Sequence, residues 1–158
     1  MGLSERIASG DRLRTWEGNF PLEHLYTVGV AGERALRELK DHGRLLGTRC
    51  ARCEVTYAPA RLYCERCLTR LDEWVPIALV GTLASYTMVH QDVDGQLLET
   101  PALVGLIGLD DASGHLVHRL GEFDGQQPRL GMKVEAVLRP ATERVGSIVD
   151  IRYFRPVG

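Results

Sequence analysis

A chain of 158 residues has room for one domain of ordinary size, or for two small ones that share contacts. The composition, 44% hydrophobic and 25% charged, is typical of a folded protein, and a formal net charge of -2 gives no general attraction to nucleic acid or to an anionic membrane. No apolar run approaches the roughly 20 residues that a membrane-spanning helix needs. The N-terminus is polar and charged, unlike a signal peptide, and the cysteines of the chain are paired free thiols. We therefore expect a cytoplasmic protein.

The first predicted element is a helix over residues 32–42. This stretch lacks β-branched residues and carries Lys40 and His42 at its end, where cations stabilise the helix dipole. Gly43 follows and suits a helix C-terminus. The apolar residues fall on one stripe, namely Ala31, Ala35, Leu36 and Leu39. We therefore expect residues 1–45 to form a helical N-terminal arm.

The part of the arm before this helix carries large apolar side chains among charges, and they are too few for a core of their own. They are Ile7, Leu13, Trp16, Phe20, Leu22, Leu25 and Tyr26. Two interpretations stay open. The segment folds over the rest of the chain, or it docks on another subunit, because large aromatic side chains are favoured interface anchors.

The only cysteines of the chain form two Cys-x-x-Cys pairs, Cys50 with Cys53 and Cys64 with Cys67. Four thiolates about 2.3 Å from one ion make a tetrahedral zinc site with no position left for water, so the predicted zinc is structural. Iron takes the same ligands and stays open, whereas disulfides suit an exported protein and a redox site needs only one pair. Residues 46–75 are predicted to be a zinc ribbon with short strands at 56–58 and 61–63.

Residues 76–158 have the pattern of successive strands, expected at 82–90, 102–109, 115–120, 133–139 and 147–154. The second is apolar enough for burial on both faces. In the last, alternation predicts that Val149, Ile151 and Tyr153 face inward and that the charged residues between them face solvent. Five short strands of this length fit an OB-fold barrel. The predicted fold class is mainly β: an N-terminal helical arm, a rubredoxin-like zinc ribbon and a five-stranded OB-fold barrel.

The chain resembles the acyl-CoA-associated zinc-ribbon/OB-fold proteins, a family of the domain-of-unknown-function type. Besides the two cysteine pairs, the shared motifs are at residues 59–61, 73–75, 81–87, 101–104 and 131–134. The family usually has a small residue in a left-handed conformation after each second cysteine, where this chain has Glu54 and Leu68.

The resemblance implies a structural zinc and a barrel that lies near the acyl-CoA site of a partner. It also implies a small subunit of a thiolase-like enzyme, an acyl-CoA aldolase or an acyl-CoA hydratase. Within the family, the long N-terminal segment looks most like the small subunit of benzoylsuccinyl-CoA thiolase.

The side chains that could carry chemistry do not form a catalytic pattern. The histidines, which are His24, His42, His90, His115 and His118, are interpreted as satisfied or exposed. His115 and His118 are three apart on one strand, so they should lie on opposite faces. Asp92 and Asp94 lie beside Gly95 and are interpreted as turn residues. We predict no catalytic residues and no catalysis by the chain alone.

Six arginines are close to the ribbon in sequence: Arg44, Arg49, Arg52, Arg61, Arg66 and Arg70. Acids between them cancel part of the charge. Either these arginines form exposed ion pairs, or a subset contacts the phosphates of coenzyme A or an acidic partner surface.

The predicted function is that of a noncatalytic subunit that stabilises a thiolase-like acyl-CoA enzyme and helps to form its substrate channel. An accessory subunit of an acyl-CoA hydratase or aldolase is one alternative. A nucleic-acid-binding ribbon/OB module is another, which the negative net charge and the 6% aromatic content disfavour. We expect neither nucleic acid nor membrane among the partners.

Overall fold

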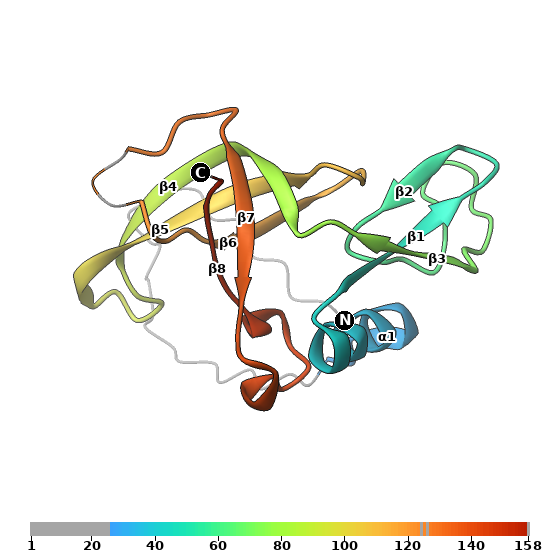
Figure 1. The fold of residues 1–158 in the computed structure, drawn as a ribbon, viewed down its shortest axis with the longest axis horizontal. Coiled ribbons are helices and arrows are strands. Elements are labelled where there is room, and N and C mark those ends of the chain that lie inside the picture. The colour runs from blue at the N-terminus through green and yellow to red at the C-terminus, as the bar shows by residue number, and fades with distance from the viewer. Residues whose placement is uncertain (1–25, 124, 126, 158) are drawn as a thin grey trace, which may run out of the picture.

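The computed structural model describes residues 26–123, 125 and 127–157. Of the apolar segment before the helix, only Tyr26 is described; Trp16, Phe20 and the other apolar residues, together with His24, lie outside the described residues. Figure 1 shows a helix and a small sheet beside a larger twisted sheet. Among the described residues, no helix is long or apolar enough to cross a membrane.

Helix α1 (Gly29–His42) begins three residues before the predicted start and ends where predicted. Gly43 is left-handed with φ 66°, and its N–H donates to the carbonyl of Leu39 at 3.0 Å. On the apolar stripe, Ala31, Ala35 and Leu39 are buried, whereas Leu36 is only half-buried. The helix therefore packs through the small residues of its stripe and through Leu39.

The ribbon is an antiparallel sheet in the order β2-β1-β3, made of β1 (Leu45–Cys50), β2 (Val55–Tyr57) and β3 (Glu73–Ile77). The predicted strand at 61–63 is wrong. The buried Thr48 explains why, because its hydroxyl accepts the N–H of Arg61 and donates to the carbonyl of Arg61, both at 2.9 Å. One side chain thus satisfies backbone groups that a strand would have paired with a neighbouring strand.

The larger sheet has the order β6-β5-β4-β7-β8. Its strands are β4 (Val80–Gln91), β5 (Leu97–Leu109), β6 (His115–Arg119), β7 (Lys133–Leu138) and β8 (Ile151–Pro156). All five predicted strands are present. Burial of β5 on both faces is wrong: Gly105, Ile107 and Leu109 are buried, but the residues between them are half-buried. One face of β5 packs on the core and the other is partly open to solvent.

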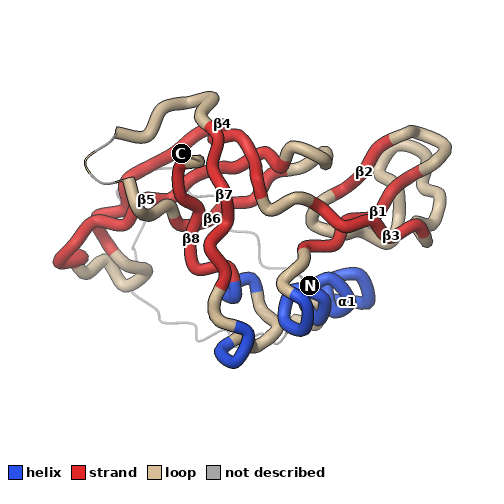
Figure 2. The backbone as a smooth tube through the Cα atoms, in the orientation of Figure 1, coloured by secondary structure: helices blue, strands red, loops and turns tan. Residues whose placement is uncertain are grey.

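The last predicted strand begins later than expected. Two short 3-10 helices, η2 (Ala141–Glu143) and η3 (Ile148–Asp150), precede β8 and lie beside α1 (Figure 2). As a result Asp150 is buried, whereas Val149 is 49% exposed, so the inward alternation predicted for this segment is wrong at both positions. Ile151 and Phe154 are the residues of β8 that enter the core.

The barrel is not closed. Strands β6 and β8 are joined by a single parallel bridge between Leu120 and Phe154, so the two edges diverge from that point. Close packing against β5 depends on glycine at position 105. A Cβ on Gly105 would lie 2.7 Å from Cδ1 of Leu83, closer than atoms pack.

Ribbon, helix and barrel share one hydrophobic core. Leu39 of α1, Leu45 of β1 and Ile77 of β3 pack in the same cluster as the barrel residues Leu83 and Phe154. The loop between β5 and β6 adds backbone bonds to the ribbon, since the N–H of Ser113 donates to the carbonyl of Thr56 at 2.6 Å. The ribbon is therefore held at a defined position against the barrel.

Candidate metal centre and cleft

The four cysteines come together at one end of the ribbon. Cys50 ends β1, Cys53 lies in the turn that follows, and Cys64 and Cys67 lie on the facing turn. All four Sγ atoms are within 4.8 Å of one another, and those of Cys50 and Cys67 are 3.6 Å apart. Sulfurs held about 2.3 Å from a tetrahedral ion are separated by about 3.8 Å. The four free thiols are thus positioned to bind one metal ion.

Both turns adopt the left-handed conformation that the family pattern implies, even though the residues there are not small. Glu54 has φ 54° and Leu68 has φ 58°. A side chain in this conformation costs about 1–2 kcal/mol. The turns are held by backbone bonds, because the N–H of Leu68 donates to the carbonyl of Cys64 at 2.9 Å. The departure from the family pattern therefore changes the residue type but not the geometry.

Hydroxyl groups lie against two of the sulfurs. The Oη atom of the buried Tyr57 is 3.3 Å from Sγ of Cys64, and Oγ1 of Thr69 is 3.3 Å from Sγ of Cys67. The hydrogen bond with Tyr57 lowers the pKa of Cys64 to about 6 and raises the pKa of Tyr57 to about 12. Thr69 likewise lowers the pKa of Cys67. Both contacts favour thiolates, which are the metal-binding form.

Cys53 shows a pKa shift opposite to those of Cys64 and Cys67. The pKa of Cys53 is raised to about 12, chiefly by its hydrogen bond with Cys67 and then by burial. A thiol among thiolates keeps its proton because another negative charge there is unfavourable. A bound cation reverses that preference, so the cluster has the charge pattern of a metal site.

The donor set also defines the metal's role. Four soft thiolates suit zinc, and with all four positions filled no open site remains for substrate or water. The small cluster around them, formed by Cys50, Tyr57, Cys64 and Leu71, is separate from the main core. A bound structural zinc would contribute on the order of 10 kcal/mol to folding, which so small a cluster cannot supply.

Most arginines near the ribbon are used in ion pairs, as one of the two interpretations expected. The pairs are Arg44–Glu38, Arg49–Glu73, Arg61–Glu65 and Arg70–Asp72. Over the ranges that the structure covers, Arg52 and Arg66 form no ion pair. The ribbon surface therefore keeps only part of the positive charge that the sequence concentrates there.

The candidate acid–base residues do not converge. Asp92 accepts the N–H groups of Asp94 at 2.9 Å and Gln96 at 2.8 Å, so its turn role is confirmed. His115 and His118 lie on opposite faces of β6, also as predicted. The Nε2 atom of His118 is 3.3 Å from the carbonyl oxygen of Ile148, while its Nδ1 atom is buried without a partner among the described residues.

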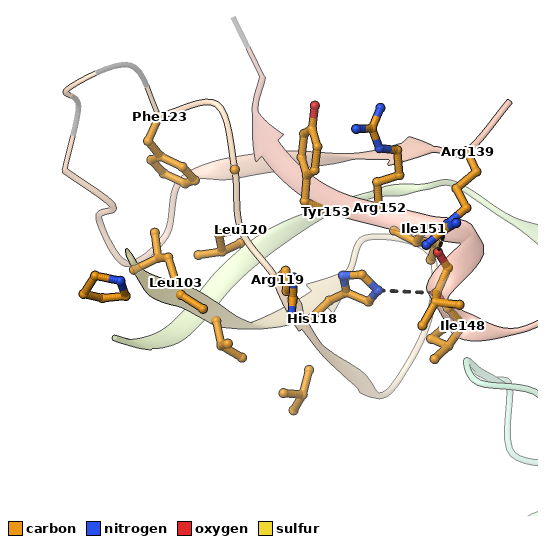
Figure 3. A pocket seen from close by; sticks show the side chains of 16 residues that line it. Leu103, His118, Arg119, Leu120, Phe123, Arg139, Ile148, Ile151, Arg152 and Tyr153 are labelled. Atoms are coloured by element: carbon orange, nitrogen blue, oxygen red, sulfur yellow. Dashed lines mark hydrogen bonds between the residues drawn. The ribbon is translucent and has the colours of Figure 1, made fainter. Parts of the chain in front are cut away.

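A second feature was missed in the sequence. A cleft of about 1010 Å³ opens on the side where β6 and β8 diverge (Figure 3). Arg119, Arg139 and Arg152 line it together with apolar and aromatic side chains. Arg119 belongs to β6, Arg152 to β8, and Arg139 follows the end of β7. The three share no spacing, so no local signal in the sequence could have joined them.

The fold and the metal centre define a zinc-ribbon/OB-fold protein. Residues 37–73 match the family model of the ChsH2 rubredoxin-like zinc ribbon domain, and residues 74–139 match that of the ChsH2 C-terminal OB-fold domain. The two matches are contiguous and together span residues 37–139, so the chain belongs to the ChsH2 zinc-ribbon/OB-fold family. The family resemblance is thereby confirmed, and so is zinc as the cofactor, because the matched ribbon is a zinc ribbon with four cysteines in place.

Two curated relatives are described as DUF35 domain-containing scaffold proteins. The one from Methanocaldococcus jannaschii is 26% identical over 111 residues, which is 70% of this chain and 78% of the relative. The one from Methanothermobacter thermautotrophicus is 23% identical over 112 residues, which is 70% of this chain and 83% of the relative.

Two solved structures share the fold. A DUF35 protein of unknown function from Sulfolobus solfataricus has a TM-score of 0.58 and 28% identity, over 69% of this chain and 78% of that one. The structure described as the Ltp2-ChsH2(DUF35) aldolase has a TM-score of 0.55 and 26% identity. The match covers 75% of this chain and 89% of that chain.

Proposed function

We propose that this protein is a noncatalytic subunit that stabilises a thiolase-like acyl-CoA enzyme and helps to form its substrate channel. The observation that carries the proposal is the likeness to a structure whose name joins a ChsH2 (DUF35) chain to an aldolase. The description of two curated relatives as scaffold proteins supports the same kind of role.

The metal centre supports a structural role. All four ligand positions are filled by cysteine, so a bound ion would have no place for a substrate oxygen or a reactive water. The chemistry of the proposed complex would then belong to the partner enzyme.

The distal half of the β4–β5 hairpin supports a role in assembly. Its strands are exposed on both faces, and it carries apolar side chains in solvent: Met88 is 55% exposed, Val93 100% and Leu97 78%. A two-stranded ribbon is marginally stable in water by itself, and exposed apolar patches mark interaction sites. This hairpin would gain stability by packing on a partner.

The proposal is tested by purifying the full-length, zinc-loaded chain from its source cells and identifying the acyl-CoA enzyme that co-purifies with it. We expect a stable hetero-oligomer in size-exclusion chromatography with light scattering. The enzyme should turn over acyl-CoA faster with this subunit than without it, and the subunit alone should show no thiolysis, aldol cleavage or hydration. Turnover by the isolated chain, abolished by His90→Ala or Asp92→Ala, would contradict the noncatalytic role.

The same purified protein distinguishes the proposed function from two alternatives. A partner with hydratase or aldolase activity, rather than a thiolase, would place this chain as the accessory subunit of that enzyme. Gel mobility of single-stranded oligonucleotides at low salt tests the nucleic-acid module, since electrostatic binding is strongest there. A clear mobility shift without any enzyme partner would favour that module.

A further inference from the structure

The cleft between β6 and β8 collects positive charge, and the acids that interact with it, Glu122 with Arg152 and Asp150 with Arg139, lie outside its lining. Arg119, Arg139 and Arg152 line it, and no Asp or Glu of the described chain does. None of the three guanidinium groups is in an ion pair within the described ranges, although Nε of Arg139 donates to the carbonyl of Val149 at 2.9 Å. The protein as a whole has a net charge of -2, so this local charge is opposite in sign to that of the molecule.

The surface between the arginines is apolar. In Figure 3, Leu103, Leu120 and Phe123 lie toward one end of the cleft, Ile148 and Ile151 lie toward the other, and the ring of Tyr153 lies between the two groups. A ligand for this cleft must therefore present negative groups separated by apolar ones.

The shape of the cleft favours a polypeptide over a compact anion. In Figure 3 the side chains of Arg119, Arg139 and Arg152 point in different directions and do not converge on one point. The cleft is also open to solvent along one side. Small-molecule sites enclose most of their ligand and converge a few polar groups on it, whereas arginine and aromatic side chains on an open surface are typical of protein interfaces.

The wall of the cleft also carries an unused hydrogen-bonding atom. When Nε2 of His118 donates to the carbonyl of Ile148, Nδ1 is an acceptor, and it is buried without a partner among the described residues. Because this atom is buried, it marks a place where the packing behind the cleft wall leaves a polar group unsatisfied, and it is not a contact for a ligand.

We propose that this cleft binds an extended acidic segment of the enzyme partner, with carboxylates against the arginines and apolar side chains between them on Leu103, Phe123 and Ile148. The inference rests on the proposed function, because it assigns the segment to that partner. It adds the chemistry of the segment and its place on the barrel.

The test uses the full-length, zinc-loaded chain labelled with ¹⁵N and needs no enzyme partner. The probe is a short blocked peptide in which glutamate alternates with leucine, followed by backbone amide shifts. We expect saturable shifts in β6 and β8 that weaken at high salt, since salt screens charge contacts. A peptide with lysine in place of glutamate should not bind.

Charge reversal makes the test specific. The double variant Arg119→Glu/Arg152→Glu should bind the acidic peptide about tenfold more weakly, and it should gain affinity for the lysine peptide. Arg52→Glu is the matched control, because Arg52 is also exposed and unpaired but lies on the ribbon, and it should bind like wild type. Zinc content and amide dispersion check folding, and single Arg119→Gln and Arg152→Gln variants replace the double variant if it does not fold.

Two outcomes overturn the proposal. Equal binding of the acidic peptide by wild type and by the charge-reversed variant would show that the arginines are not the contact. Shifts of the same amides by inorganic pyrophosphate or coenzyme A, with none by the peptide, would make the cleft a small-anion site. Either result leaves the hetero-oligomer experiment unaffected, so the failure of this inference is distinguishable from the failure of the proposed function.

Discussion

At the scale of single residues, the metal centre depends on more than its four cysteines. Tyr57 is fully buried, and its hydroxyl lies against Cys64, while Thr69 holds Cys67. The cysteine spacing made the ligands readable in the sequence, but Tyr57 carries no comparable signal. A tyrosine at the end of a short strand is equally compatible with an ordinary core position.

Replacing one cysteine tests the metal centre directly. We expect about one zinc ion per wild-type chain in elemental analysis and almost none in Cys53→Ser, because a closed shell that lacks one ligand holds zinc weakly. The ribbon of the variant should become sensitive to protease. Arg52→Gln, one residue away, should keep its zinc. A metal-free wild type of equal stability would contradict a structural ion.

Tyr57→Phe tests the contribution of the hydroxyl. The variant keeps the buried ring but removes the group that donates to Cys64. Loss of such outer contacts typically reduces metal affinity by about 10–100-fold, so zinc should pass to a competing chelator at a correspondingly lower chelator concentration. Thr56→Ser on the same strand is the control. Unchanged zinc affinity would mean that Tyr57 contributes only through packing.

At the scale of elements, the connection before β8 depends on Asp150. Its buried carboxylate accepts N–H groups from Val145 at 2.9 Å, Gly146 at 2.8 Å and Ser147 at 3.3 Å. Burial alone would raise the pKa of Asp150, but these backbone donors outweigh it and the pKa is lowered. The alternation of apolar residues predicted a strand here. The bonds from Asp150 to the backbone could not be foreseen, because such bonds leave no periodic pattern in the sequence.

Asp150→Asn should lower the free energy of unfolding by about 2–3 kcal/mol, because an amide leaves a buried backbone N–H without an acceptor. A lowered folded-state pKa contributes stability above the ordinary carboxyl value of 3.8, and that contribution is lost as the pH falls through the lower folded-state value. The difference between wild type and variant in urea unfolding should therefore shrink on acidification. Glu143→Gln is the control, and a difference independent of pH would contradict the charge effect.

At the scale of the whole molecule, α1 belongs to the core. Residues 1–25, which precede it in the chain, lie outside the described residues. Leu39 is fully buried against the barrel cluster, so a truncation must keep the helix. This gives a clean boundary for testing the predicted docking arm.

Deleting residues 1–25 should leave a folded, zinc-loaded ribbon and barrel that no longer holds its enzyme partner. The physical reason is that interface energy concentrates in a few aromatic anchors, each worth about 2 kcal/mol or more. Trp16→Ala alone should weaken the complex measurably in an affinity titration, with Glu5→Gln as the control. Undiminished binding by the folded deletion variant would exclude docking, and an aggregated variant would show that the segment completes this chain's own core.

The sequence by itself determined the features that depend on local spacing. Two Cys-x-x-Cys turns place sulfurs on one side of a metal, Gly43 ends a helix, and the apolar runs set the strands of the barrel. The tertiary structure alone decided the open side of the barrel and the cleft that it creates. Arg119, Arg139 and Arg152 line one cleft because β6 and β8 diverge from a single bridge. Pairing between distant strands depends on the packing of the whole core, and no local pattern of residues records it.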